Sequence, residues 1–456
     1  MIYSILLVNV SLLFICVAIK GFDYSNPIVL CFIFAVLSNM CSCILLDDYS
    51  VIIKGDVTSI CIIGSLSIFG GGVIGDKIGG KQHFDYLSYQ QLYISNKQIV
   101  FASVFAFIVI GITYHEIQNV VNVGGVSVER IIQTIHAYRP YSADHYHTLP
   151  LYTTSIIRVL KILAYIFAYS FAYEYDHLKI VNLKYFPTII AYGLCDFIRA
   201  QRNSWIYLAL IIATFLILLN PNKTVNQIPK HTIRINVKLL RIIMFSLIVP
   251  VLLFSNNSVR HAISRNTKWS SFRYITHYFG ISLIGFQQWL NQGGKAKFDY
   301  FPIHSFPAGV KSILYFFPSL NIKEAEQVKY VYANGVGLSN TFTSFKRYYN
   351  DYGYMGVIVF SFVCAFILSY LHKKILNGQM GLFGIIMYIG FAVGFYLTYY
   401  DEHLFRQISS GLIVDILSLI IMLKAFRVGN ITESKKIGRI FETRITAKAH
   451  FMSWRR

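Results

Sequence analysis

The chain has 456 residues, of which 55% are hydrophobic and 14% are charged, and its formal net charge is +20 at pH 7. Soluble globular domains carry about 25% charged residues, so this composition excludes a soluble multidomain protein. Apolar runs of about 17–22 residues recur along the chain, and each can cross a hydrocarbon core about 30 Å thick. The composition therefore predicts an all-α polytopic membrane protein.

Eleven apolar runs, within a range of about 10–13 that such counting allows, are expected to be transmembrane helices. The fifth run is interrupted by Arg158 and Lys161. The first run is followed by Lys20 and Gly21 rather than by a small-residue cleavage site, which predicts a retained helix. The runs cover residues 2–19, 27–46, 57–74, 98–114, 155–173, 183–198, 204–219, 239–254, 354–371, 380–400 and 407–426.

The distribution of Lys and Arg predicts the orientation of these helices, because cytoplasmic loops are enriched in both residues. Residues 427–456 form a basic cytoplasmic tail, and residues 1–426 form the membrane domain. Alternation of the eleven spans then puts the N-terminus outside. The basic residues of the tail and of the other expected cytoplasmic segments are Lys77, Lys81, Lys97, Lys223, Lys230, Arg234, Lys238, Lys373, Lys374, Arg427, Lys435, Lys436, Arg439, Arg444, Lys448, Arg455 and Arg456.

Two long segments then face outward, residues 115–154 and 255–353. The second is rich in aromatic residues, which disordered segments lack, so we expect a large, partly helical loop with a helix near Ile275–Leu290. It holds 11 basic and 4 acidic residues, a balance of 11 − 4 = +7. Such a surface suits a ligand with phosphate and sugar groups. Contact with anionic lipid headgroups is the alternative.

A second basic cluster lies between the sixth and seventh spans. Arg199 and Arg202 fall on the outer side, where arginine is disfavoured in short loops. Either the local topology differs from the expected one, or these arginines face a ligand. Asp196 is an expected ion-pair partner of one of them, since ionisable groups at the membrane edge are usually paired or functional.

The segment Asn340–Gly356 reads NTFTSFKRYYNDYGYMG. Its Asn-x-x-Thr start, followed by a Tyr-x-Asp-(Phe/Tyr)-Gly-x-x-Gly run at Tyr349–Gly356, resembles the end of the large periplasmic loop in Wzy-type O-antigen polymerases, the oligosaccharide repeat-unit polymerases. Tyr278–Gly280 with Phe286–Leu290 resembles the start of that loop.

The resemblance extends to the arginine pair, which is similar to an arginine site that precedes a mid-chain span in this family. The sequence motif covers only about 20 residues, whereas the topology covers most of the chain. Many relatives have more spans and a cytoplasmic N-terminus, so the chain departs from the family pattern at this end.

The resemblance implies a metal-independent glycosyltransferase, without a cofactor, in the bacterial inner membrane and with its active site facing the periplasm. The donor would be an undecaprenyl-diphosphate-linked oligosaccharide, which is attacked at its anomeric carbon. The acceptor would be the non-reducing-end hydroxyl of a second lipid-linked repeat unit in lipopolysaccharide O-antigen biosynthesis. Membrane lipids are further implied partners, a chain-length regulator protein is left open, and no nucleic acid is expected.

This reaction needs cations that stabilise the leaving diphosphate and a base that takes the acceptor proton. The candidate bases are Asp351, Glu402 and His403. Asp351 could equally cap a helix N-terminus, and His403 could equally pair with Glu402. The residues expected to bind the diphosphate and the sugars are Arg199, Arg202, Arg273, Asn340, Lys346, Arg347 and Tyr348.

Two glycine motifs resemble nucleotide-binding loops but lack the required context. Gly70-x-Gly72-x-x-Gly75 ends an apolar span with no βαβ pattern around it. The loop that follows has Gln82 where the magnesium-binding Ser or Thr of a P-loop would stand. We expect these glycines to allow close helix packing or a turn.

Three other features are weak indications of chemistry. The loop segment Asp144–His147 lacks a helical pair of metal ligands. The seven cysteines lie in or near apolar runs, as small buried residues do. Asp415 lies inside the last span, where it could pair with a buried base such as Arg158 or contact a neighbouring helix.

Two other functions share parts of this pattern. An O-antigen ligase would have the same architecture. Loss of a ligase leaves long chains on the carrier lipid, whereas loss of a polymerase leaves single repeat units on the lipid A core. A flippase of lipid-linked oligosaccharides should show repeated halves and short loops, which the long outward segment does not favour. A chain-length or scaffold protein would have far fewer spans.

Overall fold

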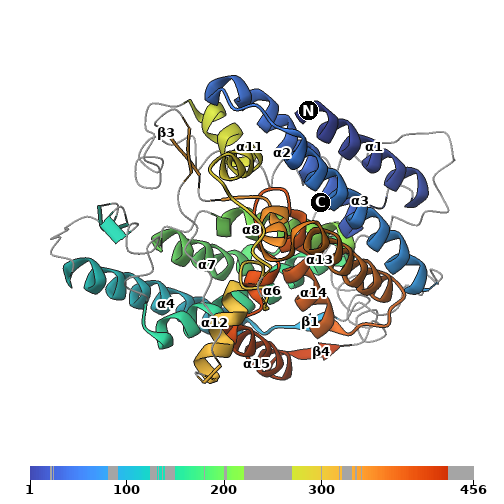
Figure 1. Ribbon diagram of the computed structural model, residues 1–456. Coiled ribbons are helices and arrows are strands. Elements are labelled where there is room, and N and C mark those ends of the chain that lie inside the picture. Colours follow the sequence, from blue (N-terminus) through green and yellow to red (C-terminus); the bar gives the residue numbers. More distant parts are fainter. Residues whose placement is uncertain are drawn as a thin grey trace, which may run out of the picture.

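The computed structural model is a bundle of helices with two very small sheets (Figure 1). It describes residues 1–20, 23, 25–80, 91–123, 131, 133–135, 137–138, 149–178, 180–199, 203–219, 270–298, 300–317, 319–320, 331–333, 336–339 and 341–429. The expected spans in these ranges are helical. The expected span 239–254 lies outside them, so the count of eleven stays a prediction.

Six helices of the described part are long and apolar enough to cross a membrane. The protein therefore has the architecture of a multi-pass helical membrane protein. Local signals explain some boundaries: Pro27 opens one helix, and Asn26 caps it by accepting a 3.0 Å hydrogen bond from Ile28 N. The six are α1 Ile2–Lys20, α2 Pro27–Tyr49, α3 Gly55–Ile78, α4 Asn96–Val123, α6 Leu151–Tyr173 and α13 Ser344–Leu376.

Shorter helices complete the bundle, and two of them lie in the long segment 255–353, which we call the outer loop. The loop helix expected near Ile275–Leu290 is confirmed as α11 Ser271–Asn291, which Ser270 caps. The second loop helix is α12 Pro307–Phe316. The remaining short helices and turns are η1 Glu174–Leu178, η2 Leu183–Tyr185, α7 Phe186–Ile198, α8 Asn203–Leu218, α14 Leu382–Tyr396, η4 Phe405–Gln407 and α15 Ser410–Ala425.

Two short strand pairs accompany the helices of the expected all-α membrane architecture, and each strand is three or four residues long. β1 Gln91–Tyr93 pairs antiparallel with β4 Arg427–Gly429. β2 Val331–Ala333 pairs with β3 Val336–Ser339 inside the outer loop. The first pair joins the start of α4 to the end of α15, so these two chain segments lie at one end of the bundle.

Contacts between chain segments divide the connections into two sets. At the tail end, which we define by β1 and β4, Gln98 reaches the Ala425 carbonyl at 3.0 Å and Lys184 reaches Asn96 at 3.1 Å. At the loop end, the α2–α3 connection contacts the outer loop, where Lys54 N donates to Gln287 Oε1 at 2.7 Å. The start of α15 also contacts the outer loop, where Ser410 N donates to Ser312 Oγ at 2.7 Å. The described end of the chain at Gly429 and the described part of the outer loop thus lie at opposite ends of the bundle.

Helices α3 and α13 pack with their backbones in close approach. A Cβ at Gly71 would overlap the carbonyl oxygen of Phe362, and one at Gly75 would overlap that of Phe366. Small residues four positions apart allow such contact between membrane helices. The expected packing role is confirmed for Gly72 and Gly75, but not for Gly70, where a Cβ would meet nothing within 4 Å.

The ionisable residues of α6 and α15 pair inside the bundle. Asp415 Oδ2 lies 2.5 Å from Lys161 Nζ and 3.1 Å from Arg158 Nη1. This pairing explains how α6 holds two basic residues in an otherwise apolar run, and it confirms Asp415 as the partner of Arg158. A buried charge is tolerated when it is paired in this way.

Helix α13 is bent where its first two turns meet the long apolar part. Gly353 has φ 57° and ψ −144°, a conformation that side chains disfavour. Gly356 then approaches the Tyr348 carbonyl so closely that a Cβ would overlap it. The two glycines of the Tyr349–Gly356 run thus set a kink, which directs the segment Ser344–Asp351 into the bundle.

The segment after α14 also enters the bundle. Helix α14 has 15 residues, about 22 Å at 1.5 Å per residue, which is shorter than a hydrocarbon core of about 30 Å. Tyr399, Asp401 and Glu402 follow it and are at most 1% exposed. We call residues 397–409 the re-entrant loop.

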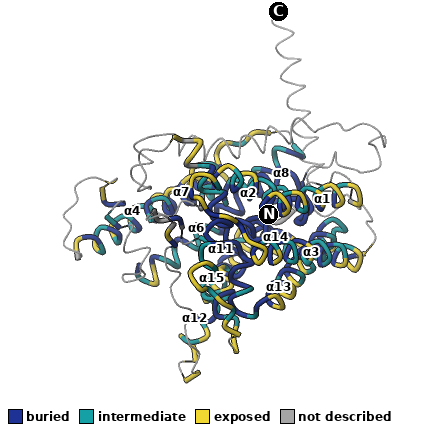
Figure 2. The backbone as a smooth tube through the Cα atoms, turned by 45° about the horizontal axis from the view of Figure 1, so that its top comes forward, coloured by how far each residue is buried: buried dark blue, intermediate teal, exposed yellow. Residues whose placement is uncertain are grey.

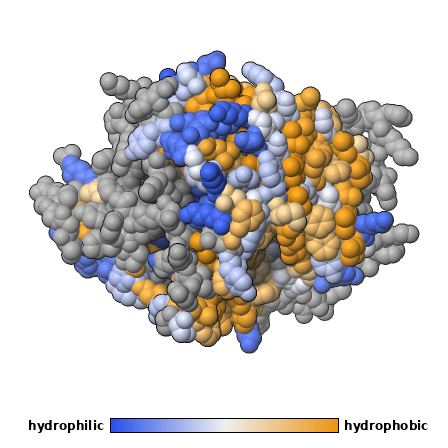
Figure 3. All heavy atoms as spheres, viewed as in Figure 1, coloured by the Kyte–Doolittle hydropathy of each residue, from blue (hydrophilic) through white to orange (hydrophobic). Residues whose placement is uncertain are grey.

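The outer surface of the bundle is apolar on several helices. Phe14 of α1 is 70% exposed and Phe101 of α4 is 75% exposed, as is usual for side chains that face lipid. Buried residues gather at the centre of the molecule, where α6, α11 and α14 lie (Figure 2). Apolar side chains cover the side on which α1 and α3 lie (Figure 3). This distribution fits a protein embedded in a bilayer.

Candidate functional site

Asp401 of the re-entrant loop lies between two arginines, and we call these three residues the charged cluster. Arg347 Nη2 is 3.5 Å from Asp401 Oδ1, and Arg406 Nη1 is 3.0 Å from Asp401 Oδ2. Arg347 and Asp401 are buried, whereas the Arg406 side chain is 39% exposed. Two guanidinium groups thus share one carboxylate at the loop end of the bundle.

The charges of this cluster are stable at neutral pH. Burial acts to raise the pKa of Asp401, but Arg406 and Arg347 outweigh it and hold that pKa below its usual range. Arg347 also donates from Nη1 to the His304 carbonyl at 3.4 Å, while its Nε is buried and has no hydrogen-bond partner in the described part of the chain. A guanidinium has five N–H donors, so Arg347 keeps one for a ligand oxyanion.

Glu402 is buried next to Asp401, and both of its oxygens accept backbone hydrogen bonds. Oε1 accepts from Phe405 N at 2.7 Å, and Oε2 accepts from Arg406 N at 3.2 Å. Burial raises the pKa of Glu402 to about 7, although the Phe405 N–H and the nearby arginines act to lower it. A carboxyl group of this kind can gain or lose a proton near neutral pH. The same bonds also shape the turn η4.

His403 lies between two tyrosine rings. Tyr207 of α8 meets it edge-on with ring centroids 5.2 Å apart, and Tyr400 stacks on it at 5.9 Å. Burial lowers the pKa of His403 to about 4, so the imidazole is neutral at pH 7. Because Glu402 bonds to the backbone instead, the structure does not show the expected alternative in which His403 pairs with Glu402.

Asp351 holds the connection that leads into α12. Its carboxylate accepts hydrogen bonds from His304 N at 2.9 Å, from Ser305 N at 2.7 Å and from Ser305 Oγ at 2.5 Å. The residue lies within α13, just before the kink, so it does not cap the helix N-terminus as the sequence alternative suggested. Its hydrogen bonds fix the backbone of His304, which in turn accepts a hydrogen bond from Arg347.

Lys346 points toward α11 rather than toward the charged cluster. Its Nζ is 4.6 Å from the ring centroids of both Trp289 and Phe342, and it makes no hydrogen bond or ion pair with the described residues. A cation–π contact contributes about 2 kcal/mol at a buried site, whereas burying an ion costs several kcal/mol. The two rings therefore offset only part of the cost of burying this ammonium group.

Tyr348 is buried among aromatic rings of the same region. Its ring lies 5.3 Å from that of Phe360 and 5.9 Å from that of Phe405. Phe306, at the start of α12, stacks on Phe405 at 3.9 Å. Tyr348 thus packs the charged cluster against α12, and its contacts describe a packing residue rather than an exposed sugar platform.

Two other expected binding residues lie in separate groups. Arg199, at the end of α7, pairs with Asp196 at 2.9 Å, which confirms the expected ion pair. Arg273 pairs with Asp48 at 3.3 Å. It precedes Trp289 by 16 residues on α11, about 24 Å along a helix, so it does not join Lys346. Arg202, Asn340 and Asp144–His147 lie outside the described residues.

The sequence interpretation missed several members of the site. Asp401 and Arg406 flank Glu402 and His403, and charged residues so close together between two apolar runs were a usable signal. His304 and Ser305 contribute backbone groups, which carry no sequence signal. Within the described ranges, no group of three His, Cys, Asp or Glu side chains is arranged to hold a metal ion.

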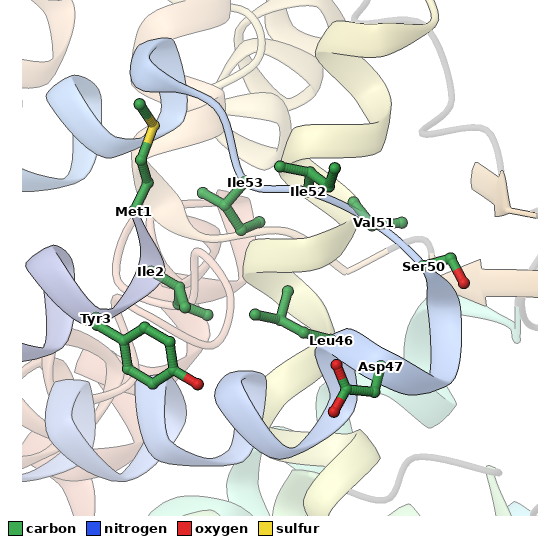
Figure 4. Close-up of a pocket in the computed structure, with 9 residues that line it drawn as sticks. All are labelled: Met1, Ile2, Tyr3, Leu46, Asp47, Ser50, Val51, Ile52 and Ile53. Atoms are coloured by element: carbon green, nitrogen blue, oxygen red, sulfur yellow. The ribbon is translucent and has the colours of Figure 1, made fainter.

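A shallow hollow of about 460 Å³ lies at the loop end, between the start of α1 and the end of α2 (Figure 4). Met1, Tyr3 and Asp47 line it together with residues 50–53. It contains none of the candidate site residues, so the charged cluster is the better candidate for chemistry.

The charged cluster and its neighbours Glu402 and His403 combine two guanidinium groups, a neutral imidazole and a carboxyl group with a pKa of about 7, and all of them except Arg406 are buried. Such a site can bind an oxyanion and move a proton. In comparisons with protein-family models, with curated proteins and with solved structures, no match to the chain is found.

Proposed function

We propose that the protein is an O-antigen polymerase, which joins undecaprenyl-diphosphate-linked repeat units at the periplasmic face of the bacterial inner membrane. The observation that carries this proposal is the pair of arginines on one carboxylate, Arg347 and Arg406 with Asp401, at the loop end of an apolar helical bundle. The motif Tyr349–Gly356, which resembles that family, forms the kink that turns Arg347 toward Asp401.

The proposed reaction transfers a glycan from a lipid diphosphate to a sugar hydroxyl. The new bond forms between the acceptor oxygen and the anomeric carbon, the bond from that carbon to the diphosphate breaks, and the diphosphate leaves with the electron pair. Guanidinium groups match phosphate oxygens in bidentate geometry. Arg347 and Arg406 would stabilise the charge that develops on the leaving group.

The acceptor hydroxyl must lose a proton. Glu402 has its pKa raised to about 7 by burial, and His403 has its pKa lowered to about 4 by burial, so both supply a basic form at neutral pH. Asp351 is engaged by three hydrogen bonds and is better suited to positioning. We therefore place Glu402 first and His403 second as the general base, with Asp351 as a positioning residue.

The proposal is tested by glycan ladders from a deletion strain that carries variants of the chain. Arg347→Ala and Arg406→Ala should abolish long O-antigen chains at normal protein levels, leaving single repeat units on the lipid A core. Arg199→Ala tests the arginine that lies apart. Normal ladders from both Arg347→Ala and Arg406→Ala would remove the two arginines from the site, a normal ladder in the deletion strain itself would overturn the polymerase assignment, and long chains retained on the carrier lipid would indicate a ligase.

The orientation is tested separately. A reporter enzyme that is active only in the periplasm should be active when fused after Pro302 and inactive when fused after Gly429. The opposite result would place the charged cluster in the cytoplasm, where the proposed substrates are not polymerised.

A further inference from the structure

The N-cap residue and one face of the first two turns of α13 carry buried polar groups that the described part of the chain does not satisfy. Thr343 is the N-cap residue of the helix, and Lys346, Arg347 and Asn350 fall within about 100° of the helix circumference at 100° per residue. All four residues are at most 5% exposed. Thr343 Oγ1, Arg347 Nε and Asn350 Oδ1 are buried without a hydrogen-bond partner among the described residues.

Lys346 is the basic residue of this face that pairs with no carboxylate among the described residues. Asp401 is shared by Arg347 and Arg406, and Asp351 is held by His304 and Ser305. The ammonium group instead contacts the rings of Trp289 and Phe342. The face therefore offers a cationic donor beside a hydroxyl and an amide oxygen.

We propose that this face of α13 is a subsite for a sugar residue that bears an acidic group, with the sugar's carboxylate on Lys346 and its hydroxyls on Thr343 and Asn350. The inference rests on the proposed function and adds a substrate class to it: a repeat unit that contains a hexuronic acid or a similar acidic sugar. Charge-assisted hydrogen bonds are the strong ones in such recognition.

The mixture of groups favours a sugar over a simple ion. Arg347 Nε and Lys346 Nζ donate, Asn350 Oδ1 accepts, and Thr343 Oγ1 can do either. A fully ionised phosphate group has no hydrogen to donate to an acceptor such as Asn350 Oδ1. A sugar acid supplies both acceptors and hydroxyl donors, and so can satisfy every member of the face.

The test measures binding by the full chain in lipid nanodiscs, using isothermal titration calorimetry with D-glucuronate, D-glucose and pyrophosphate as probes. The wild type should bind glucuronate about tenfold or more tightly than glucose, and Lys346→Met should lose most of this difference. Lys346→Arg, which keeps the charge, should keep it. Lys295→Met is the matched control, because Lys295 is exposed and lies outside the subsite.

The pyrophosphate probe distinguishes the sugar carboxylate proposed for Lys346 from the diphosphate proposed for Arg347. Pyrophosphate binding should survive Lys346→Met and fall in Arg347→Ala. The subsite is overturned if glucuronate does not bind, if it binds no better than glucose, if Lys346→Met binds it like the wild type, or if Lys346→Met loses pyrophosphate instead. If a strain that lacks the chain kept a normal glycan ladder while Lys346→Met lost glucuronate binding in nanodiscs, the polymerase assignment would fail and the subsite would stand.

Discussion

Asn9, in the middle of the first helix, donates a 2.9 Å hydrogen bond from Nδ2 to the hydroxyl of Tyr399, at the start of the re-entrant loop. Both residues are at most 1% exposed. Ser65 of α3 also bonds to each of them. The loop that carries Asp401 is thus anchored to α1 and α3 near the centre of the bundle.

Removing the Tyr399 hydroxyl should loosen this anchor. Tyr399→Phe leaves Asn9 and Ser65 bonded to each other, so we expect a loss of about 1 kcal/mol in the free energy of unfolding. The measurement is the thermal midpoint of the purified protein in detergent. Tyr354→Phe is the control, since Tyr354 is 39% exposed on α13; equal midpoints for the two variants would mean that the anchor contributes nothing.

Bulky residues at the α3–α13 contact should separate the two helices. Gly71→Leu places a side chain against the Phe362 carbonyl, and overpacking of this kind costs about 1–3 kcal/mol, here at the upper end because backbone must move. The thermal midpoint should fall clearly. Gly70→Leu is the matched control, because a Cβ at Gly70 meets nothing within 4 Å. A Gly71→Leu protein as stable as Gly70→Leu would contradict the packing.

Neutralising Asp401 should expose the repulsion between its two arginines. Asp401→Asn keeps the shape of the side chain but removes the charge, and breaking a buried ion pair costs about 3–5 kcal/mol. We expect a lower thermal midpoint and no long glycan chains. Asp401→Asn combined with Arg406→Gln should recover part of the stability. Asp47→Asn, on an exposed residue, should change little; a wild-type midpoint for Asp401→Asn would argue against the pairing.

Glu402 should make stability depend on pH in a defined direction. Its pKa is raised from 4.5 to about 7 by burial, so the folded state keeps a proton that the unfolded chain releases. The stability of the wild type relative to Glu402→Gln should therefore fall as pH rises from 4.5 to 7 and level off above that. The comparison with Glu402→Gln cancels the opposite contribution of His403, whose depressed pKa favours folding above pH 4. Parallel stability curves for the two proteins would refute the raised pKa.

The helical spans could be predicted because their signal is local. Apolar length alone defines helices such as α1 and α3, and the serine before α11 marks its start. The two ionisable residues of α6 were recognised as anomalous, and Asp415 was named as a partner of one of them. Composition could not predict where an apolar run stops being a transmembrane helix. The apolar run 380–400 predicts a full span, yet α14 ends after 15 residues and the chain that follows it is buried inside the bundle.

The candidate site was predicted in part, for a related reason. Arg347, Lys346, Glu402 and His403 are named from their chemistry; the structure places Arg347 on Asp401, the neighbour of Glu402 and His403, whereas Lys346 points toward Trp289 of α11. The partner that unites the arginines, Asp401, was not named, because pairing across 54 residues depends on how the chain folds back. Arg199 and Arg273 have the same chemistry but lie on other helices, each with its own carboxylate.

The bend at Gly353 gives α13 two separate tasks. Beyond the bend the helix packs against α3. Before the bend, the short segment Ser344–Asp351 carries Lys346 and Arg347. Phe298 lies against the bend, and a Cβ at Gly353 would come within 3.2 Å of its ring. The positions of Lys346 and Arg347 therefore depend on one residue that has no side chain of its own.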